Sequence, residues 1–204
     1  GLKLSAVRNR ALTDAYEPGS TVKPFVVGVA LQSGNYGPQS TIDTNPGFIR
    51  VGNFTIRDPL NRGEITLGEA IMHSSQVGIS KLALDLNEYE VRAMFEKLGF
   101  GRDAGTGFPG ESAGRLPNHR RWTDIERAAF AYGYGLTVTP LQLAASYLTI
   151  ASGGIKRDVS LIVGAERNDQ RIYSREVADQ LKQILASVVT DGTAKKAAIQ
   201  GYAV

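Results

Sequence analysis

Ser20 and Lys23 stand three residues apart in the stretch YEPGSTVKPFVV, behind a Pro-Gly turn and ahead of a nearly uncharged run. A serine hydroxyl becomes a good nucleophile only when a neighbouring base takes its proton. Lysine is ordinarily too basic for that role, with a pKa of about 10.4. Burial among apolar groups lowers this pKa, because desolvation disfavours the charged form. The pair is therefore a candidate for acyl transfer at a serine, with Lys23 as the base.

The position of Ser20 at a predicted helix start favours the same chemistry. Side chains three apart on a helix lie on one face, and free backbone N–H groups at a helix N-terminus can stabilise the oxyanion that forms when Ser20 attacks a carbonyl. A simpler interpretation is that Ser20 caps the helix and Lys23 extends its amine to solvent. The S-x-x-K spacing is common by chance and does not decide between the two on its own.

The elements that must position this pair are mostly helices. The run from Ser20 to Gln32 has apolar residues on every face, which predicts a buried helix. Thr66 and Glu69 form a capping box that opens a helix continuing to Ser74. A second helix is predicted from Ser75 to Leu86.

Similar signals predict the remaining elements. The first is a hairpin in FIRVGNFTIRD with its turn at Gly52-Asn53, followed by a helix that has Val91, Met94, Phe95 and Leu98 on one face and stops at Gly99. A long loop from Gly101 to Asn118 comes next, and then a helix from Thr139-Pro140 to the SGG sequence. The last two are a short strand in VSLIVG and a helix after Ser174 with Val177, Leu181, Ile184, Leu185 and Val188 on one side. The chain is therefore expected to be mostly helical, with few strands.

Composition limits the possible functions. The chain has 204 residues, of which 42% are hydrophobic and 21% charged, an ordinary balance for one globular domain. The net charge is +3, and the one locally basic stretch, RLPNHRR, has no aromatic ladder beside it, so no nucleic-acid partner is expected. The sequence has no cysteine, which excludes thiol catalysis, disulfides and a cysteine-based zinc site.

Other titratable residues form no convincing site. His73 and His119 are isolated and have no partner at a metal-ligand spacing, so no metal-binding role is assigned to them. Asp14, Asp58 and Asp124 show no paired arrangement in the sequence.

Four stretches, in order, resemble a known family. AVRNRALTDAYEPGSTVKPF resembles the active-site serine region of class B penicillin-binding proteins, specifically the division (septal) D,D-transpeptidases. HSSQVGISKLALDL is similar to the family's second motif, S-x-N, and the helix that follows it. The sequence RWTDIERAAFAYGYGLTVTPLQLAASYLTIASGGI is similar to the family's stretch between the second and third motifs. GTAKKAAIQGYAV resembles the approach to the third motif, K-[ST]-G.

The resemblance implies an α+β fold of the penicillin-binding and serine β-lactamase-like type, in which residues 1–204 hold mostly the helical part and little of the central antiparallel sheet. It implies Ser20 as nucleophile, Lys23 as base and Ser74 as a proton relay. Gln76 stands where the family has Asn and is carried over as the amide that holds the substrate. Tyr132 and Tyr134 lie in a loop that lines the family's pocket, although ordinary core packing explains these aromatic residues equally well.

The implied reaction is cross-linking of peptidoglycan stem peptides through the D-Ala–D-Ala amide, without a cofactor, at the periplasmic face of the bacterial inner membrane. β-Lactams would acylate the same serine, and the septal cell-division machinery would be the partner. Alternatives are a serine β-lactamase, a D,D-carboxypeptidase, and a non-catalytic penicillin-sensing or division scaffold. The sequence contains no K-[ST]-G triplet and no apolar run long enough to cross a membrane. We therefore expect the K-[ST]-G strand, the sheet strands that follow it and an N-terminal anchor in a longer parent protein.

Overall fold

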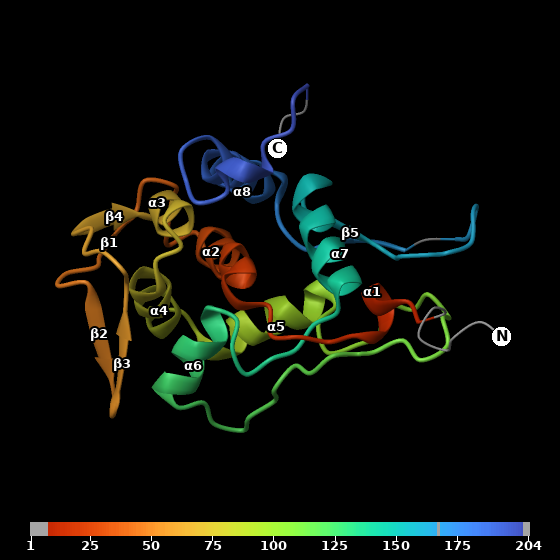
Figure 1. Ribbon diagram of the computed structural model, residues 1–204, viewed down its shortest axis with the longest axis horizontal. Coiled ribbons are helices and arrows are strands. Elements are labelled where there is room, and N and C mark those ends of the chain that lie inside the picture. Colours follow the sequence, from red (N-terminus) through yellow and green to blue (C-terminus); the bar gives the residue numbers. More distant parts are fainter. Residues whose placement is uncertain (1–7, 167, 202–204) are drawn as a thin grey trace.

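The computed structural model describes residues 8–166 and 168–201, and its helices gather around α2 (Lys23–Gln32). Helix α8 (Arg175–Thr190) packs on one side of α2, and α4 (Gln76–Asp85) and α5 (Glu88–Leu98) pack on the other (Figure 1). Short antiparallel strand pairs lie at the periphery of this bundle. The predicted α+β class, with helices dominating, is confirmed.

Helix α2 is buried along nearly its whole length, as its apolar sequence predicts. Phe25 lies in its first turn and meets the rings of Phe95, Phe100 and Tyr147 at centroid distances of 5.3–6.1 Å. At Gly28 the helix approaches the next layer so closely that an added Cβ would lie 2.8 Å from the Tyr173 ring. The helix therefore holds its first residue, Lys23, in a fixed place within the core.

The start of this helix differs from the prediction. The α-helix begins at Lys23, and Ser20 lies in a preceding 3₁₀ turn, η2 (Gly19–Val22). Pro24 has no backbone N–H and cannot donate to the Ser20 carbonyl in the α-helical pattern. That carbonyl instead accepts from the N–H of Lys23, one residue earlier. Ser20 thus lies outside the helix, on an exposed turn.

The other predicted helix starts are confirmed, but the helix predicted to continue to Ser74 ends at Met72. Helix α3 (Leu67–Met72) opens with the reciprocal capping box between Thr66 and Glu69. The N-cap of α4 is Ser75, whose side chain accepts from the N–H of Gly78, and α5 ends at Gly99 in the left-handed region. The remaining helical elements are α1 (Arg10–Thr13), α6 (Asp124–Ala131), α7 (Pro140–Ala151) and the 3₁₀ turn η3 (Lys195–Ala197).

The strands within residues 8–166 and 168–201 form three separate antiparallel pairs. They are β1 (Thr41–Asp43) with β4 (Glu64–Thr66), β2 (Phe48–Val51) with β3 (Phe54–Arg57), and β5 (Ile155–Arg157) with β6 (Asp169–Arg171). The pair β2–β3 is the predicted hairpin, with Val51 opposite Phe54 across the Gly52-Asn53 turn.

The strand predicted in VSLIVG, residues 159–164, is wrong. This segment belongs to the connection between β5 and β6 and consists of irregular backbone, bends and turns. Its apolar side chains are largely exposed, and Val163 is fully exposed, because no strand of the described chain pairs with it. Within the described residues, no helix is long and apolar enough to cross a lipid bilayer.

Candidate active site

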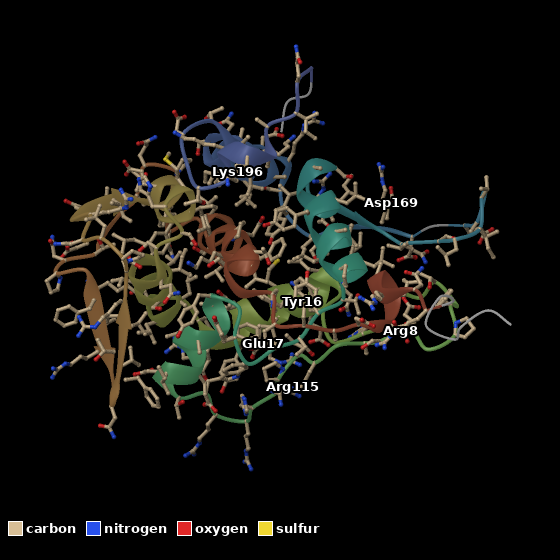
Figure 2. All side chains as sticks on the ribbon, in the orientation of Figure 1. Arg8, Tyr16, Glu17, Arg115, Asp169 and Lys196 are labelled. Atoms are coloured by element: carbon tan, nitrogen blue, oxygen red, sulfur yellow. The ribbon has the colours of Figure 1, made fainter. Side chains whose placement is uncertain are left out.

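Ser20 is exposed, and the residues just before it are hydrogen-bonded to a segment far away in the sequence. The Tyr16 and Val138 backbones exchange two hydrogen bonds of 3.0 and 2.9 Å, and Glu17 Oε1 accepts from the Gly135 N–H at 3.0 Å. Tyr16 and Glu17 lie close to Arg115, whose guanidinium donates to the Gly135 carbonyl at 3.0 Å (Figure 2). The approach to Ser20 is therefore fixed by the loop that carries Tyr132 and Tyr134.

Lys23 lies beneath this turn with only 1% of its surface exposed. Its Nζ donates to Ser74 O at 2.6 Å and to Ser74 Oγ at 3.0 Å. Burial lowers the pKa of Lys23 from its ordinary 10.5 to about 8, and the negative charge of Asp58 partly opposes this effect. A lysine with such a pKa is neutral in roughly a tenth of the molecules at pH 7, and this neutral form can accept a proton.

Ser20 and Lys23 come from adjacent turns, but no hydrogen bond of the described residues joins their side chains; the amine's partner is Ser74. Catalytic hydrogen bonds are often long in unliganded enzymes and tighten only when substrate is bound. The structure thus brings together Lys23 and Ser74, as the family resemblance predicted. Direct proton transfer from Ser20 stays a prediction.

Ser74 reaches Lys23 from an unusual backbone conformation. Its φ of 55° makes it the only residue other than glycine with a positive φ in the described chain. This region costs a residue with a side chain of the order of 1–3 kcal/mol, so the surrounding contacts must stabilise it. The Ser74 N–H donates to Ile71 O at 2.9 Å, and the Ser75 N–H donates to Ala70 O at 2.8 Å. The break between α3 and α4 is what directs Ser74 toward the lysine.

Asp58 is a component of the site that the sequence did not reveal. Its carboxylate accepts hydrogen bonds from the Ser75 hydroxyl, from the Gln76 N–H at 2.6 Å and from the Val77 N–H at 3.2 Å. Sequence reasoning found no partner for this aspartate, because its partners lie 17 to 19 positions away and two of them are backbone groups. The only sequence signal that could have identified Asp58 is its position at the end of the predicted hairpin.

Gln76 is the first residue of α4 and is half-buried. Its backbone N–H is bound by Asp58, and no hydrogen bond from its side chain is found among the described residues. The position brings the residue next to Ser74, as the resemblance implied. Its role as the substrate-holding amide stays a prediction.

Tyr132 and Tyr134 flank Gly133, and their rings meet edge to face at 5.6 Å. Tyr132 packs against a small apolar cluster that includes Val51 and Ile56. The Tyr134 side chain is 50% exposed. Core packing thus accounts for Tyr132, whereas Tyr134 is free to meet a bound molecule.

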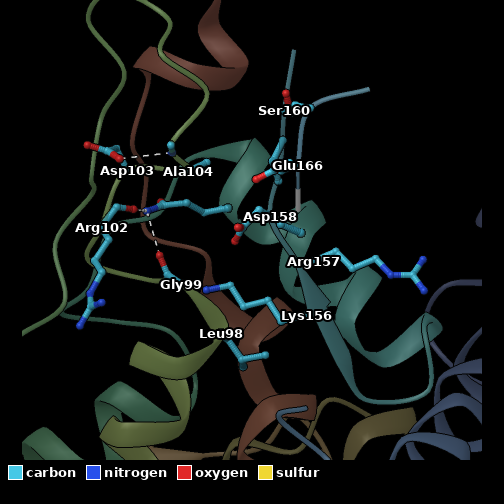
Figure 3. A pocket seen from close by; sticks show the side chains of 15 residues that line it. Leu98, Gly99, Arg102, Asp103, Ala104, Lys156, Arg157, Asp158, Ser160 and Glu166 are labelled. Atoms are coloured by element: carbon cyan, nitrogen blue, oxygen red, sulfur yellow. Dashed lines mark hydrogen bonds between the residues drawn. The ribbon is translucent and has the colours of Figure 1, made fainter. Parts of the chain in front are cut away.

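A separate pocket of about 440 Å³ lies between the C-terminal end of α5, the start of α7 and the β5–β6 hairpin (Figure 3). Its charged side chains are of both signs and include Arg102, Lys156, Asp158 and Glu166. None of Ser20, Lys23 and Ser74 lines it, so it is distinct from the candidate active site.

Comparison with known proteins identifies the class. Residues 2–204 match the family model for the penicillin binding protein transpeptidase domain. The chain is 41% identical over 204 residues to the peptidoglycan D,D-transpeptidase FtsI of Escherichia coli (strain K12), covering 99% of this chain and 34% of that protein. It is 36% identical over 197 residues to the probable peptidoglycan D,D-transpeptidase PenA of Neisseria meningitidis serogroup B, covering 96% of this chain and 34% of that protein.

The fold agrees with this match. The apo transpeptidase domain of penicillin-binding protein 3 from Burkholderia pseudomallei superposes with a TM-score of 0.90 and 37% identity, covering 96% of this chain and 60% of that one. The chain therefore belongs to the penicillin-binding protein transpeptidase family. Its motifs and its similarity to FtsI make it part of a class B transpeptidase domain. It spans about a third of the length of these two curated relatives.

Proposed function

We propose that this chain carries the acylation centre of a D,D-transpeptidase that cross-links peptidoglycan stem peptides during septal wall synthesis. The observation that carries the proposal is the buried Lys23 amine, which meets both oxygens of Ser74 one turn from the exposed Ser20. The names of the relatives, peptidoglycan D,D-transpeptidase among them, support the same reaction.

In the proposed acylation step, Ser20 Oγ attacks the carbonyl carbon of the D-Ala–D-Ala amide. Neutral Lys23 takes the hydroxyl proton, and backbone N–H groups of the 3₁₀ turn that carries Ser20 stabilise the oxyanion. The amide C–N bond then breaks, and the proton passes by way of Ser74 to the leaving nitrogen of D-Ala. An acyl ester on Ser20 remains.

In the second step, the amine of a neighbouring stem peptide attacks this ester. The C–O bond to Ser20 breaks, a new amide forms, and the serine recovers its proton. A β-lactam would acylate Ser20 in the same way, but its ring-opened product would stay attached. The amide of Gln76 and the exposed ring of Tyr134 are the proposed contacts to the donor peptide.

The remaining parts of the machinery are also proposals. We propose that residues 1–204 are part of a transpeptidase domain whose K-[ST]-G strand and following sheet strands belong to the same longer protein. That protein would be anchored in the inner membrane, face the periplasm and act with the septal division machinery. The similarity to FtsI, of which the chain covers a third, supports this assignment.

Covalent labelling tests the proposal. The full-length protein is treated with a fluorescent penicillin, digested, and examined by mass spectrometry. The adduct is expected on the peptide that contains Ser20, and Ser20→Ala should abolish it. An adduct on Ser74 or Ser75 would refute the assignment of the nucleophile, and a protein that takes up no label would be better described as a scaffold.

The same experiment separates transfer from hydrolysis. A β-lactamase needs a base that activates water against the acyl-enzyme. Glu17, the acid nearest to Ser20 in the sequence, is already held by the Gly135 N–H. The bound penicillin should therefore persist for many minutes, whereas rapid turnover of nitrocefin would favour the hydrolase.

A further inference from the structure

Asp58 holds three successive residues of the turn that follows Ser74. It lies half-buried directly after β3, and its own N–H donates to Gly47 O at 3.0 Å. One carboxylate oxygen accepts from the Gln76 and Val77 N–H groups, and the other accepts from the Ser75 hydroxyl. The β2–β3 hairpin is thereby tied to the first turn of α4.

These contacts explain how the strained turn is held. Ser75 Oγ also accepts from the Gly78 N–H at 2.8 Å, so Asp58 and Ser75 together bind the free N–H groups at the start of α4. A carboxylate at this position is further stabilised by the positive end of the helix dipole. Ser74 immediately precedes this hydrogen-bonded segment. The bonds that hold the residues after Ser74 therefore help to keep its φ at 55°.

The turn sets the distance to Lys23. Lys23 Nζ reaches the carbonyl and the hydroxyl of the same serine, at 2.6 and 3.0 Å, which requires that Ser74 keep this one backbone conformation. Asp58 forms no hydrogen bond to Lys23. Within the part of the chain that the structure describes, it is also the one ionisable group whose charge perturbs the pKa of Lys23, and it raises that pKa against the effect of burial.

We propose that Asp58 is a positioning residue for acylation: by binding Ser75, Gln76 and Val77, it holds Ser74 in the left-handed conformation that presents both of its oxygens to Lys23. This inference deepens the proposed function and rests on it. The competing explanation is that Asp58 only caps a helix, in which case its loss lowers stability and leaves the chemistry unchanged.

Variants of the full-length protein separate these two explanations. Asp58→Ala removes all three hydrogen bonds. Asn87→Ala is the matched control, because Asn87 caps α5 by accepting from the N–H groups of Tyr89 and Glu90, away from Ser74. Loss of an N-cap side chain typically costs about 1 kcal/mol of stability. Melting temperature and the rate of acylation by fluorescent penicillin are measured for each.

We expect both variants to lose stability, but only Asp58→Ala to lose acylation rate, by at least about tenfold, since a displacement of roughly 1 Å can cost about 100-fold. Acylation by Asp58→Ala within twofold of wild type would overturn the proposal and leave the proposed function intact. A wild-type protein that takes up no label would overturn the proposed function and this inference with it.

Asp58→Asn provides a second test, which holds even if the alanine variant does not fold. The amide oxygen can still accept from the two backbone N–H groups, whereas the negative charge is lost. The pH midpoint of acylation should therefore fall below that of wild type, because the charge of Asp58 raises the pKa of Lys23. An unchanged midpoint together with an unchanged rate would mean that Asp58 acts only as a helix cap.

Discussion

Gly133 lies directly against Gly19, the residue before the candidate nucleophile. The Gly19 N–H donates to the Gly133 carbonyl at 3.1 Å. A Cβ added at Gly133 would lie 2.0 Å from the Gly19 carbonyl oxygen, and the φ of Gly133 is +91°. The tyrosine loop and the serine turn are thus in backbone contact, and a side chain at position 133 must push them apart.

Gly133→Ala is therefore expected to displace Ser20 and slow acylation by at least about 100-fold, on the scale of a roughly 1 Å misplacement. Gly135→Ala is the matched control. Its φ of +78° imposes a similar backbone strain, but a Cβ there would meet nothing within 4 Å. Penicillin labelling rates of the two variants, compared with their melting temperatures, test this. Equal labelling rates for the two variants would mean that backbone strain, and not the contact with Gly19, slows acylation.

Replacing the lysine with arginine tests the base. Arginine keeps the positive charge but cannot give up its proton in a protein. Lys23→Arg should therefore acylate at least about 100-fold more slowly than wild type, the low end of the effect of losing a general base. A rate near that of wild type would mean that Lys23 acts only as a cation.

The pH dependence of acylation provides an independent check on the same residue. Burial lowers the pKa of Lys23 to about 8, so the amine is mostly protonated below that pH and mostly neutral above it. The acylation rate should rise about tenfold per pH unit below the midpoint and level off above pH 8. The residual rate of Lys23→Arg should lack this step, and a wild-type rate that is flat from pH 6 to 9 would contradict the role of base.

Gln76 is the point at which this chain departs from the family's S-x-N motif. Its side chain is one methylene longer than that of Asn, so its amide must be brought into place by another rotamer at a higher entropic cost. Gln76→Asn should therefore raise the acylation rate, measured as the second-order rate constant for penicillin binding. If the variant is no faster, the neighbouring residues have already adapted to glutamine.

Much of the helical fold was predictable because its signals are local. The capping box of Thr66 and Glu69 and the glycine stop at Gly99 each act within a few residues, and both are confirmed. The VSLIVG strand failed because a strand needs a partner, and the composition of a short apolar run does not supply one. The shift of the helix start to Lys23 was also readable in principle, from the missing N–H of Pro24.

The candidate site was predictable only in part. The S-x-x-K spacing drew attention to Ser20 and Lys23, and the family resemblance added Ser74. The hydrogen bonds of Asp58 depend on tertiary contacts between a hairpin and a helix start, and no spacing in the sequence encodes them. The positive φ of Ser74 likewise belongs to the break between α3 and α4, where tertiary contacts outweigh the local preference of serine.

The final prediction concerns the 204-residue chain by itself. Helices α7 and α8 leave an apolar groove of about 660 Å³ lined by Tyr147, Leu148, Leu185 and Ala186, and Leu148 is 49% exposed. Exposed apolar surface of this kind is typical of a face that packs against another element. We propose that this face is covered by the sheet strands of the proposed longer protein, which would also provide the K-[ST]-G contacts; the 204 residues contain no K-[ST]-G triplet.

The isolated chain should therefore bind the dye ANS more strongly than the full-length protein and tend to aggregate. Its labelling by fluorescent penicillin should be slower by at least about 100-fold, since losing one preorganised donor costs 10²–10³ in rate and several would be lost together. Addition of a fragment that carries the remaining strands should restore part of the labelling. If the isolated chain is labelled at the full-length rate, the third motif is dispensable for acylation, and Ser20, Lys23 and Ser74 are sufficient.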